Sequence, residues 1–203
     1  MRQLYHYWFS PFSRKIRIAL IEKNMDFKLS LELPWQRRHE FLIINPAGTV
    51  PVIVEEDNIT IVGTNAITEY LEEKDDTTNL LGKTSIQRAE VRRLIEWFDV
   101  KFFEEVTNLV MTEKVMKMFL KRGMPQAAAI RCAGQNIKHH LHYIEYLTDR
   151  RNWLAGDDFS YADISAAAHI SCIDYFGDVP WNDFQGARDW YARIKSRPSM
   201  QII

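Results

Sequence analysis

Strand-forming patterns are confined to about the first 80 of the 203 residues, and only helical patterns follow them. Alternating apolar and polar residues predict strands over 3–8 and 27–33. Two β-rich runs, 50–54 and 59–62, are joined by a polar connection and predict a hairpin. Helical spacing predicts helices over 13–23, 38–44 and 64–74, with Thr64 capping the last. The first segment therefore has the order β-α-β-α-β-β-α.

The remainder of the chain has a helical period throughout. The predicted helices cover residues 86–110, 113–122, 127–147, 159–175 and 183–195. We therefore expect an α/β domain at 1–75, a linker at 76–84 and an all-helical bundle at 85–203. Ser160 and Asp163 have the spacing of a reciprocal capping box, with the acid shortened from Glu to Asp.

The charge balance and hydropathy exclude several classes of partner. Lys and Arg number 26 against 27 Asp and Glu, a formal net charge of -1, which argues against bulk binding of nucleic acid or anionic membrane. Apolar runs such as 41–44 are too short to cross a bilayer, and no basic-then-apolar leader precedes the first strand. We expect a cytoplasmic protein without membrane insertion.

The cysteines and histidines predict no metal site and no disulfide framework. Cys132 and Cys172 lie forty residues apart in helical segments rich in Ala and Ile, where we expect them to be buried. His139 and His142 can share a helix face with His140 between them, but no acid or cysteine completes a tetrahedral set.

Two hydroxyls, those of Ser10 and Ser13, lie where the first strand meets the first helix. A helix N-terminus presents free N–H groups and partial positive charge, so a hydroxyl there can help to hold a thiolate. Redox enzymes of this topology place cysteine at this point, and serine excludes disulfide chemistry. The alternative is that Ser10 only caps the helix.

The proline at the start of the third strand has two interpretations. A trans bond between Val50 and Pro51 fits an ordinary strand start. A cis bond would turn the backbone N–H and C=O of Val50 toward a peptide-like ligand.

The loop that contains Trp35, Arg37 and Arg38 is a candidate surface for binding a partner protein. Trp and Arg dominate binding hot spots, and loops carry function more often than scaffold elements do. Both arginines can meet an acidic partner segment. The alternative is that Trp35 anchors the loop and the arginines are solvated. A second aromatic group (Trp97, Phe98, Phe102 and Phe103) predicts core and dimer interface, with a pocket for a hydrophobic substrate as the alternative.

In combination these motifs resemble the cytosolic glutathione S-transferase superfamily over essentially the whole chain. The resemblance rests on the β-α-β-α-β-β-α order, the run Ser-Pro-x-Ser-Arg-Lys from Ser10, Asn45-Pro46 before Val50-Pro51, and the Ser160–Asp163 box. It implies a glutathione S-transferase fold, in which a thioredoxin-like N-terminal domain precedes a helical bundle. It also implies a homodimer with glutathione as a ligand or substrate and no required cofactor.

The resemblance assigns roles to individual residues. It implies that Ser10 or Ser13 stabilises the thiolate, that Val50 and Pro51 meet the cysteinyl backbone, and that Thr64 and Asn65 meet the γ-glutamyl end. The family usually has an acid before the hydroxyl of the third helix, whereas this chain has Gly63. Loss of one charge-assisted hydrogen bond costs about 1.5–3 kcal/mol, or roughly ten- to hundredfold in affinity.

A narrower resemblance is to the glutathione-transferase-like division proteins of alphaproteobacteria that bind FtsZ. Residues 35–41, 45–51, 90–94 with 97–99, and 190–198 carry it, and members of that group continue beyond the Arg-Pro-Ser segment into a C-terminal tail. It implies a dimeric adaptor that binds FtsZ, with weak or no conjugation. Two alternatives stay open: an active glutathione S-transferase that acts on small electrophiles, and a non-catalytic dimer with another protein partner.

Overall fold

The computed structural model describes residues 1–201, which form two compact units, 1–79 and 80–201. The last two residues of the segment expected to be helical, 202 and 203, lie outside the described residues. A separate linker over residues 76–84 stays a prediction.

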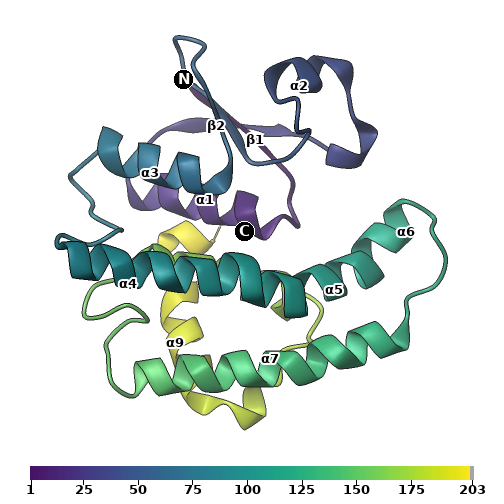
Figure 1. The fold of residues 1–203 in the computed structure, drawn as a ribbon, viewed down its shortest axis with the longest axis vertical. Helices are drawn as coiled ribbons and strands as arrows, with labels where there is room; N and C mark the ends of the chain where they lie inside the picture. The colour runs from purple at the N-terminus through teal and green to yellow at the C-terminus, as the bar shows by residue number, and fades with distance from the viewer. Residues whose placement is uncertain (202–203) are drawn as a thin grey trace. The chain divides into compact units, whose positions relative to one another are not determined.

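The first unit has the predicted order of elements. It contains β1 (Arg2–His6), α1 (Pro11–Glu22), β2 (Phe27–Leu31), α2 (His39–Ile44), β3 (Val52–Val54), β4 (Thr60–Val62) and α3 (Thr64–Lys74). The strand order is β2-β1-β3-β4, with β1 parallel to β2 and antiparallel to β3. This is the mixed sheet of a thioredoxin-like domain, with α1 and α3 on one face and α2 on the other (Figure 1).

The alternation along β1 explains how the sheet is covered. Leu4 and His6 are buried, while Gln3 and Tyr5 are partly exposed, which is the period of two expected of a strand. The Tyr5 ring packs against Phe41 of α2, with ring centroids 5.4 Å apart. The short α2 therefore covers only part of its face of the sheet.

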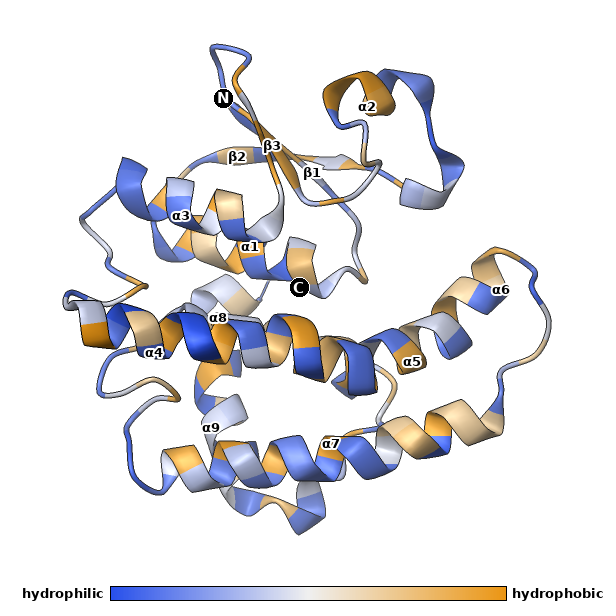
Figure 2. Ribbon diagram, in the orientation of Figure 1, coloured by the Kyte–Doolittle hydropathy of each residue, from blue (hydrophilic) through white to orange (hydrophobic). Residues whose placement is uncertain are grey.

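All the secondary-structure elements that the structure describes in the second unit are helices, joined by irregular loops. Its α-helices are α4 (Ser85–Glu96), α5 (Asn108–Met111), α6 (Lys117–Phe119), α7 (Ala127–Thr148), α8 (Tyr161–Asp174) and α9 (Gln185–Lys195). Two π-helical segments, Trp97–Thr107 and Thr112–Met116, join α4, α5 and α6 into one helical run, so the break expected between residues 110 and 113 is wrong. Hydrophobic and hydrophilic residues alternate along this run and along α7 (Figure 2), as expected of helices with one buried face.

The central helix of this unit is α8, in which every residue from Tyr161 to Ile173 is buried. Its sequence has no polar face, which is typical of a helix surrounded by others. The predicted capping box at its start is confirmed: the Ser160 side chain caps the helix, and the Asp163 carboxylate accepts from the Ser160 backbone N–H at 3.1 Å. Every helix within the described part of the chain is too short or too polar to cross a bilayer.

A charged network on the second unit gives it a pH-dependent stability. Glu90 accepts hydrogen bonds from Arg93 (Nε, 2.8 Å) and Arg151 (Nη1, 2.6 Å). The hydrogen bond from Arg93 is the largest of the effects that lower the pKa of Glu90 to about 2. A carboxyl whose pKa is lower in the folded state stabilises the fold above its unfolded pKa and loses that effect as the pH falls toward the folded value.

We expect Glu90→Gln to flatten the acid limb of the stability curve. Between about pH 4.5 and 2 the wild-type free energy of unfolding should fall by up to about 3 kcal/mol more than that of the variant. Urea unfolding at a series of pH values measures this difference. Glu96→Gln, at an exposed position of the same helix, is the matched control. Parallel acid limbs for wild type and Glu90→Gln would contradict the assignment.

Candidate functional site

Ser10 and Ser13 form the start of α1. Ser10 is the N-cap, its Oγ accepts from the Ser13 N–H at 3.1 Å, and Pro11 occupies the first helical position. Ser10 therefore caps the helix, and its role toward a thiolate stays a prediction. Ser13 is fully buried, and its Oγ accepts from the Tyr7 N–H at 3.3 Å. Each of these contacts uses a hydroxyl oxygen as acceptor, so both O–H groups keep their donor capacity for an anion at the helix N-terminus.

A tight turn shapes the approach to β3. The Asn45 side chain donates from Nδ2 to the Thr49 carbonyl at 2.8 Å, and its Oδ1 accepts from the Ala47 N–H at 3.1 Å. The bond between Val50 and Pro51 is cis, which decides between the two interpretations of that proline. Val50 is half-buried and precedes the paired residues of the strand, which begin at Val52.

The start of α3 differs from the prediction in one respect. Gly63, and not Thr64, is the N-cap, and no side chain caps this end. Gly63 has a φ of +93°, a conformation that glycine adopts readily, and with Gly63 as the N-cap the helix begins at Thr64, one residue earlier than a Thr64 cap would require. Thr64 is partly exposed at the first helical position and Asn65 is exposed. The free N–H groups of this 11-residue helix can still receive a carboxylate.

The sheet register brings these three segments to the same end of the first unit. Tyr5 of β1 pairs with Val52 of β3, and Val52 pairs with Val62 of β4. Because β3 is antiparallel to both neighbours, the turn after β1, the cis bond before β3 and the start of α3 after β4 lie together. The candidate glutathione residues are widely separated in sequence but thus lie at the same end of the sheet.

The loop of Trp35 lies at this end too, because His6 of β1 pairs with Leu31 at the end of the parallel β2. Trp35 lies in a 3-10 turn (Pro34–Gln36), and its ring packs edge-on against Tyr7, with centroids 5.0 Å apart. The indole of Trp35 thus anchors the loop, and because it is only half-buried, part of the indole surface stays exposed.

The two arginines of this loop have different surroundings. Arg38 donates from Nη2 to Oε2 of Glu32 at 2.7 Å, and the Glu32 side chain is only 1% exposed. This hydrogen bond raises the pKa of Arg38. Arg37 is exposed, has a left-handed φ of 47°, and makes no ion pair with any residue of the described range 1–201. The interpretation of both arginines as simply solvated therefore fails for Arg38.

Sequence reasoning missed two residues that hold this site together, Tyr7 and Glu32. Tyr7 supports Trp35 through its ring and bonds the α1 start through its backbone. The Glu32 backbone N–H donates to the His6 carbonyl at 2.9 Å, which continues the β1–β2 pairing and fixes the carboxylate that clamps Arg38. Glu32 and Arg38 lie six positions apart in the sequence, on either side of Pro34. Their opposite charges on either side of a tight turn were the only sequence signal for this ion pair.

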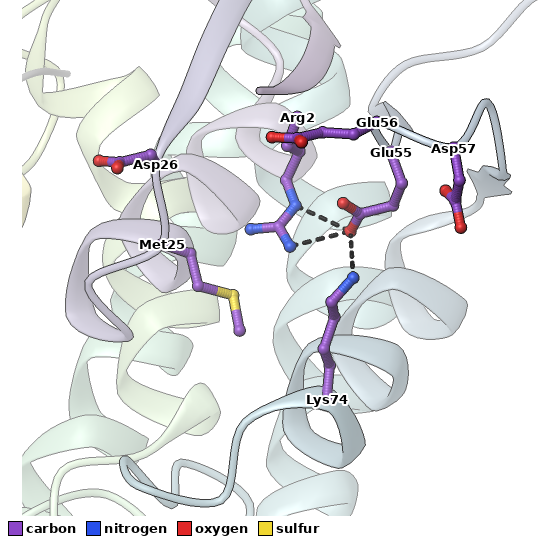
Figure 3. A pocket seen from close by; sticks show the side chains of 7 residues that line it. All are labelled: Arg2, Met25, Asp26, Glu55, Glu56, Asp57 and Lys74. Atoms are coloured by element: carbon purple, nitrogen blue, oxygen red, sulfur yellow. Dashed lines mark hydrogen bonds and ion pairs between the residues drawn. The ribbon is translucent and has the colours of Figure 1, made fainter.

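A cavity of about 610 Å³ lies at the opposite end of the first unit (Figure 3). Glu55 at its centre accepts from Arg2 Nε at 2.9 Å and from the Tyr70 hydroxyl at 3.0 Å, and lies 3.4 Å from Lys74 Nζ. Burial acts to raise the pKa of Glu55, but these partners outweigh it and the pKa is lowered. The central charges satisfy one another, so this cluster has a structural explanation.

The histidines and cysteines of the second unit also have defined surroundings. His140 is fully buried, accepts from Trp97 Nε1 at its Nδ1 (3.1 Å), and contacts Glu105 Oε2 through its Nε2 (3.0 Å). Burial lowers the pKa of His140 to about 4, so the ring is neutral at pH 7 and Nε2–H donates to the carboxylate.

Within residues 1–201 no group of three or more His, Cys, Asp or Glu side chains is arranged to hold a metal ion. Cys172 is buried as expected, but Cys132 is exposed, which corrects that prediction.

The aromatic group on the π-helical segment contributes to the core in part. Phe98 and Phe102 are fully buried, with ring centroids 6.0 Å apart. Trp97 is only partly buried and packs against Tyr143, with centroids 4.5 Å apart. The core interpretation holds for the two phenylalanines, and the dimer interface stays a prediction.

Comparisons with known proteins agree with this geometry. The family model of the glutathione S-transferase N-terminal domain matches residues 9–74, and that of the C-terminal domain matches residues 110–201. A curated relative, FtsZ-localized protein A of Caulobacter vibrioides, is 46% identical over 100% of this chain and 90% of its own length.

Solved structures show the same similarity. The crystal structure of a glutathione S-transferase from Rhodospirillum rubrum has a TM-score of 0.97 and 52% identity, covering 98% of this chain and 90% of that one. FzlA from C. crescentus has a TM-score of 0.95 and 46% identity, covering 98% and 89%.

Proposed function

The chain belongs to the glutathione S-transferase family, and we propose that it is a dimeric cytoplasmic adaptor of bacterial cell division that binds FtsZ and conjugates glutathione weakly or not at all. The observation that carries this proposal is the similarity over the whole chain to a protein described as FtsZ-localized. The loop of Trp35 and Arg37 supports it, because the Glu32–Arg38 pair and the Tyr7 contact hold that loop in a defined position. A preorganised Trp and Arg surface is the composition of a protein-binding hot spot.

The start of α3 supports weak glutathione binding. Gly63 supplies no carboxylate for the ammonium of a γ-glutamyl group, whereas Thr64 and Asn65 offer N–H groups only to its carboxylate. The missing charge-assisted hydrogen bond accounts for a loss of about 1.5–3 kcal/mol. Val50 and Pro51 would meet the cysteinyl backbone of the same ligand.

The second candidate function is conjugation, favoured by the two hydroxyls at the start of α1. Ser10 or Ser13 would donate to the glutathione thiolate and, with the helix N-terminus, lower the pKa of the thiol. The thiolate sulfur would then attack an electrophilic carbon, forming a C–S bond while the leaving group departs with its electron pair.

Two measurements on one preparation separate these functions. Co-sedimentation with FtsZ polymers tests the adaptor, and calorimetric titration of glutathione tests the ligand site. Retention of the protein in the supernatant with polymerised FtsZ would exclude the adaptor. Turnover of a model electrophile together with glutathione binding would favour the enzyme.

Arg37→Ala is expected to weaken FtsZ binding about three- to tenfold, mainly by slowing association. An exposed cation at the rim of an interface steers an acidic partner, and its contribution is screened by salt. The loss should therefore shrink when affinity is measured at high ionic strength. Arg122→Ala removes the same charge from an exposed position of the second unit and serves as the control. Equal effects of the two variants would point to net charge alone.

A further inference from the structure

The candidate partner loop and the candidate thiolate site are built on the same residue, Tyr7. Its ring supports Trp35 edge-on at 5.0 Å. Its backbone N–H donates to Ser13 Oγ at 3.3 Å, and its carbonyl accepts from the Ser10 N–H at 3.0 Å. One buried residue therefore contacts the indole offered to a partner, the hydroxyl of Ser13 and the backbone of Ser10.

The reach of a peptide ligand makes the two sites overlap. An extended tripeptide spans about 10 Å. In a tripeptide whose sulfur lies at Ser10 or Ser13, the sulfur is separated from Trp35 by a single residue, Tyr7. Tyr7 contacts Trp35 through its ring and the two serines through its backbone. The loop, the serines, Val50 and Thr64 all lie at one end of the sheet, so such a ligand and a protein partner seated on the loop would cover shared parts of one surface.

The charges of this surface also favour competition between a peptide thiol and a protein partner. Arg38 is already paired with Glu32, whereas Arg37 is exposed and makes no ion pair within the described part of the chain. A peptide thiol of the glutathione class carries two carboxylates, and an acidic partner segment carries several. Arg37 therefore offers either ligand a guanidinium that has no ion pair within residues 1–201.

We propose that an anionic peptide thiol of the glutathione class and the FtsZ partner bind this end of the first unit in a mutually exclusive manner, so that the thiol ligand regulates docking. This inference rests on the proposed function. For a competitor present at ten times its own Kd, the apparent Kd of the partner rises about elevenfold. Reciprocity requires that FtsZ present at ten times its own Kd weaken the thiol ligand by the same elevenfold factor.

The test uses the full chain, FtsZ and glutathione. Calorimetry first gives the Kd of glutathione, and the affinity for FtsZ is then measured at rising glutathione concentration. The expected result is a linear rise of the apparent Kd for FtsZ. The tripeptide γ-glutamyl-seryl-glycine, which has the same length and charge but no thiol, should need a higher concentration for the same rise. An equimolar mixture of glutamate and glycine controls for ionic strength.

Each other outcome has a defined meaning. An affinity for FtsZ that stays constant or increases at saturating glutathione overturns the competition and leaves the adaptor function intact. Absence of glutathione binding in calorimetry at millimolar concentration overturns it as well. Failure of FtsZ to bind without any ligand overturns the proposed function, and the inference falls with it.

Discussion

Asp163→Ala is expected to lower the free energy of unfolding by about 3–5 kcal/mol, the largest effect on stability that we predict. The side chain is completely buried at the start of α8. Its Oδ1 accepts from the Leu154 N–H at 3.0 Å and from Trp190 Nε1 at 2.9 Å, and its Oδ2 accepts from the Ser160 N–H at 3.1 Å. Alanine would leave these three N–H donors without an acceptor, and it would also remove the acceptor of the Ser160 hydroxyl, which donates to Oδ2 at 3.1 Å.

The site of Asp163 connects three parts of the second unit. It completes the capping box of α8, accepts from the backbone of the Leu154 loop, and accepts from the indole of Trp190 in α9. Burial raises the pKa of this carboxyl, and the hydrogen bonds that it accepts act in the opposite direction. Each orphaned buried donor costs about 1–3 kcal/mol, so the effect exceeds that of losing an ordinary helix cap.

Urea unfolding followed by circular dichroism measures this loss. Asp163→Asn keeps one side-chain oxygen as an acceptor and should fall between alanine and wild type. Asp158→Ala, at an exposed position of the preceding loop, should change the free energy of unfolding by less than about 0.5 kcal/mol. An effect of Asp163→Ala as small as that of the control would refute the role of a buried hydrogen-bond centre.

The parts of the fold that were predicted from sequence are those encoded by neighbouring residues. The Ser160–Asp163 box was predictable because both partners lie within one helical turn. The β-α-β-α-β-β-α order was predictable because alternation and helical spacing are local patterns. The additional bonds from Leu154 and Trp190 come from 9 and 27 residues away, and no local pattern announces them.

The errors have the same physical origin. The N-cap of α3 was predicted at Thr64 because its hydroxyl is a common capping group. The N-cap is Gly63 because the chain needs a φ of +93° where it leaves β4. Cys132 is exposed because its Ala-rich neighbours lie on a helix that is only partly covered. Arg38 is held by Glu32, a contact that depends on the path of the loop between them.

The candidate site was predicted as separate pieces and assembled by the sheet. Ser10, Val50 and Thr64 were singled out by motifs that are each short. Only the register Tyr5–Val52–Val62 shows that they share one end of the first unit. The role of Tyr7 required the structure, because an aromatic residue at a strand end has no distinctive pattern.

Trp35→Ala is expected to weaken FtsZ binding by at least about thirtyfold, equivalent to about 2 kcal/mol. A half-buried indole fixed against Tyr7 loses little conformational freedom when a partner covers it, so most of its contact area contributes to affinity. Co-sedimentation over a range of FtsZ concentrations measures the change. Urea unfolding in parallel should show a loss of only about 1 kcal/mol, since one aromatic contact is removed.

Two further variants separate the contact of Trp35 with FtsZ from the packing of its ring against Tyr7, which supports the loop. Trp35→Phe retains a ring against Tyr7 and should lose only part of the affinity, roughly three- to tenfold. Tyr175→Ala removes an aromatic ring that is 68% exposed in the second unit and should leave binding unchanged. Binding by Trp35→Ala within threefold of wild type would remove this loop from the interface. A loss shared equally by Tyr175→Ala would instead assign the interaction to exposed aromatic surface in general.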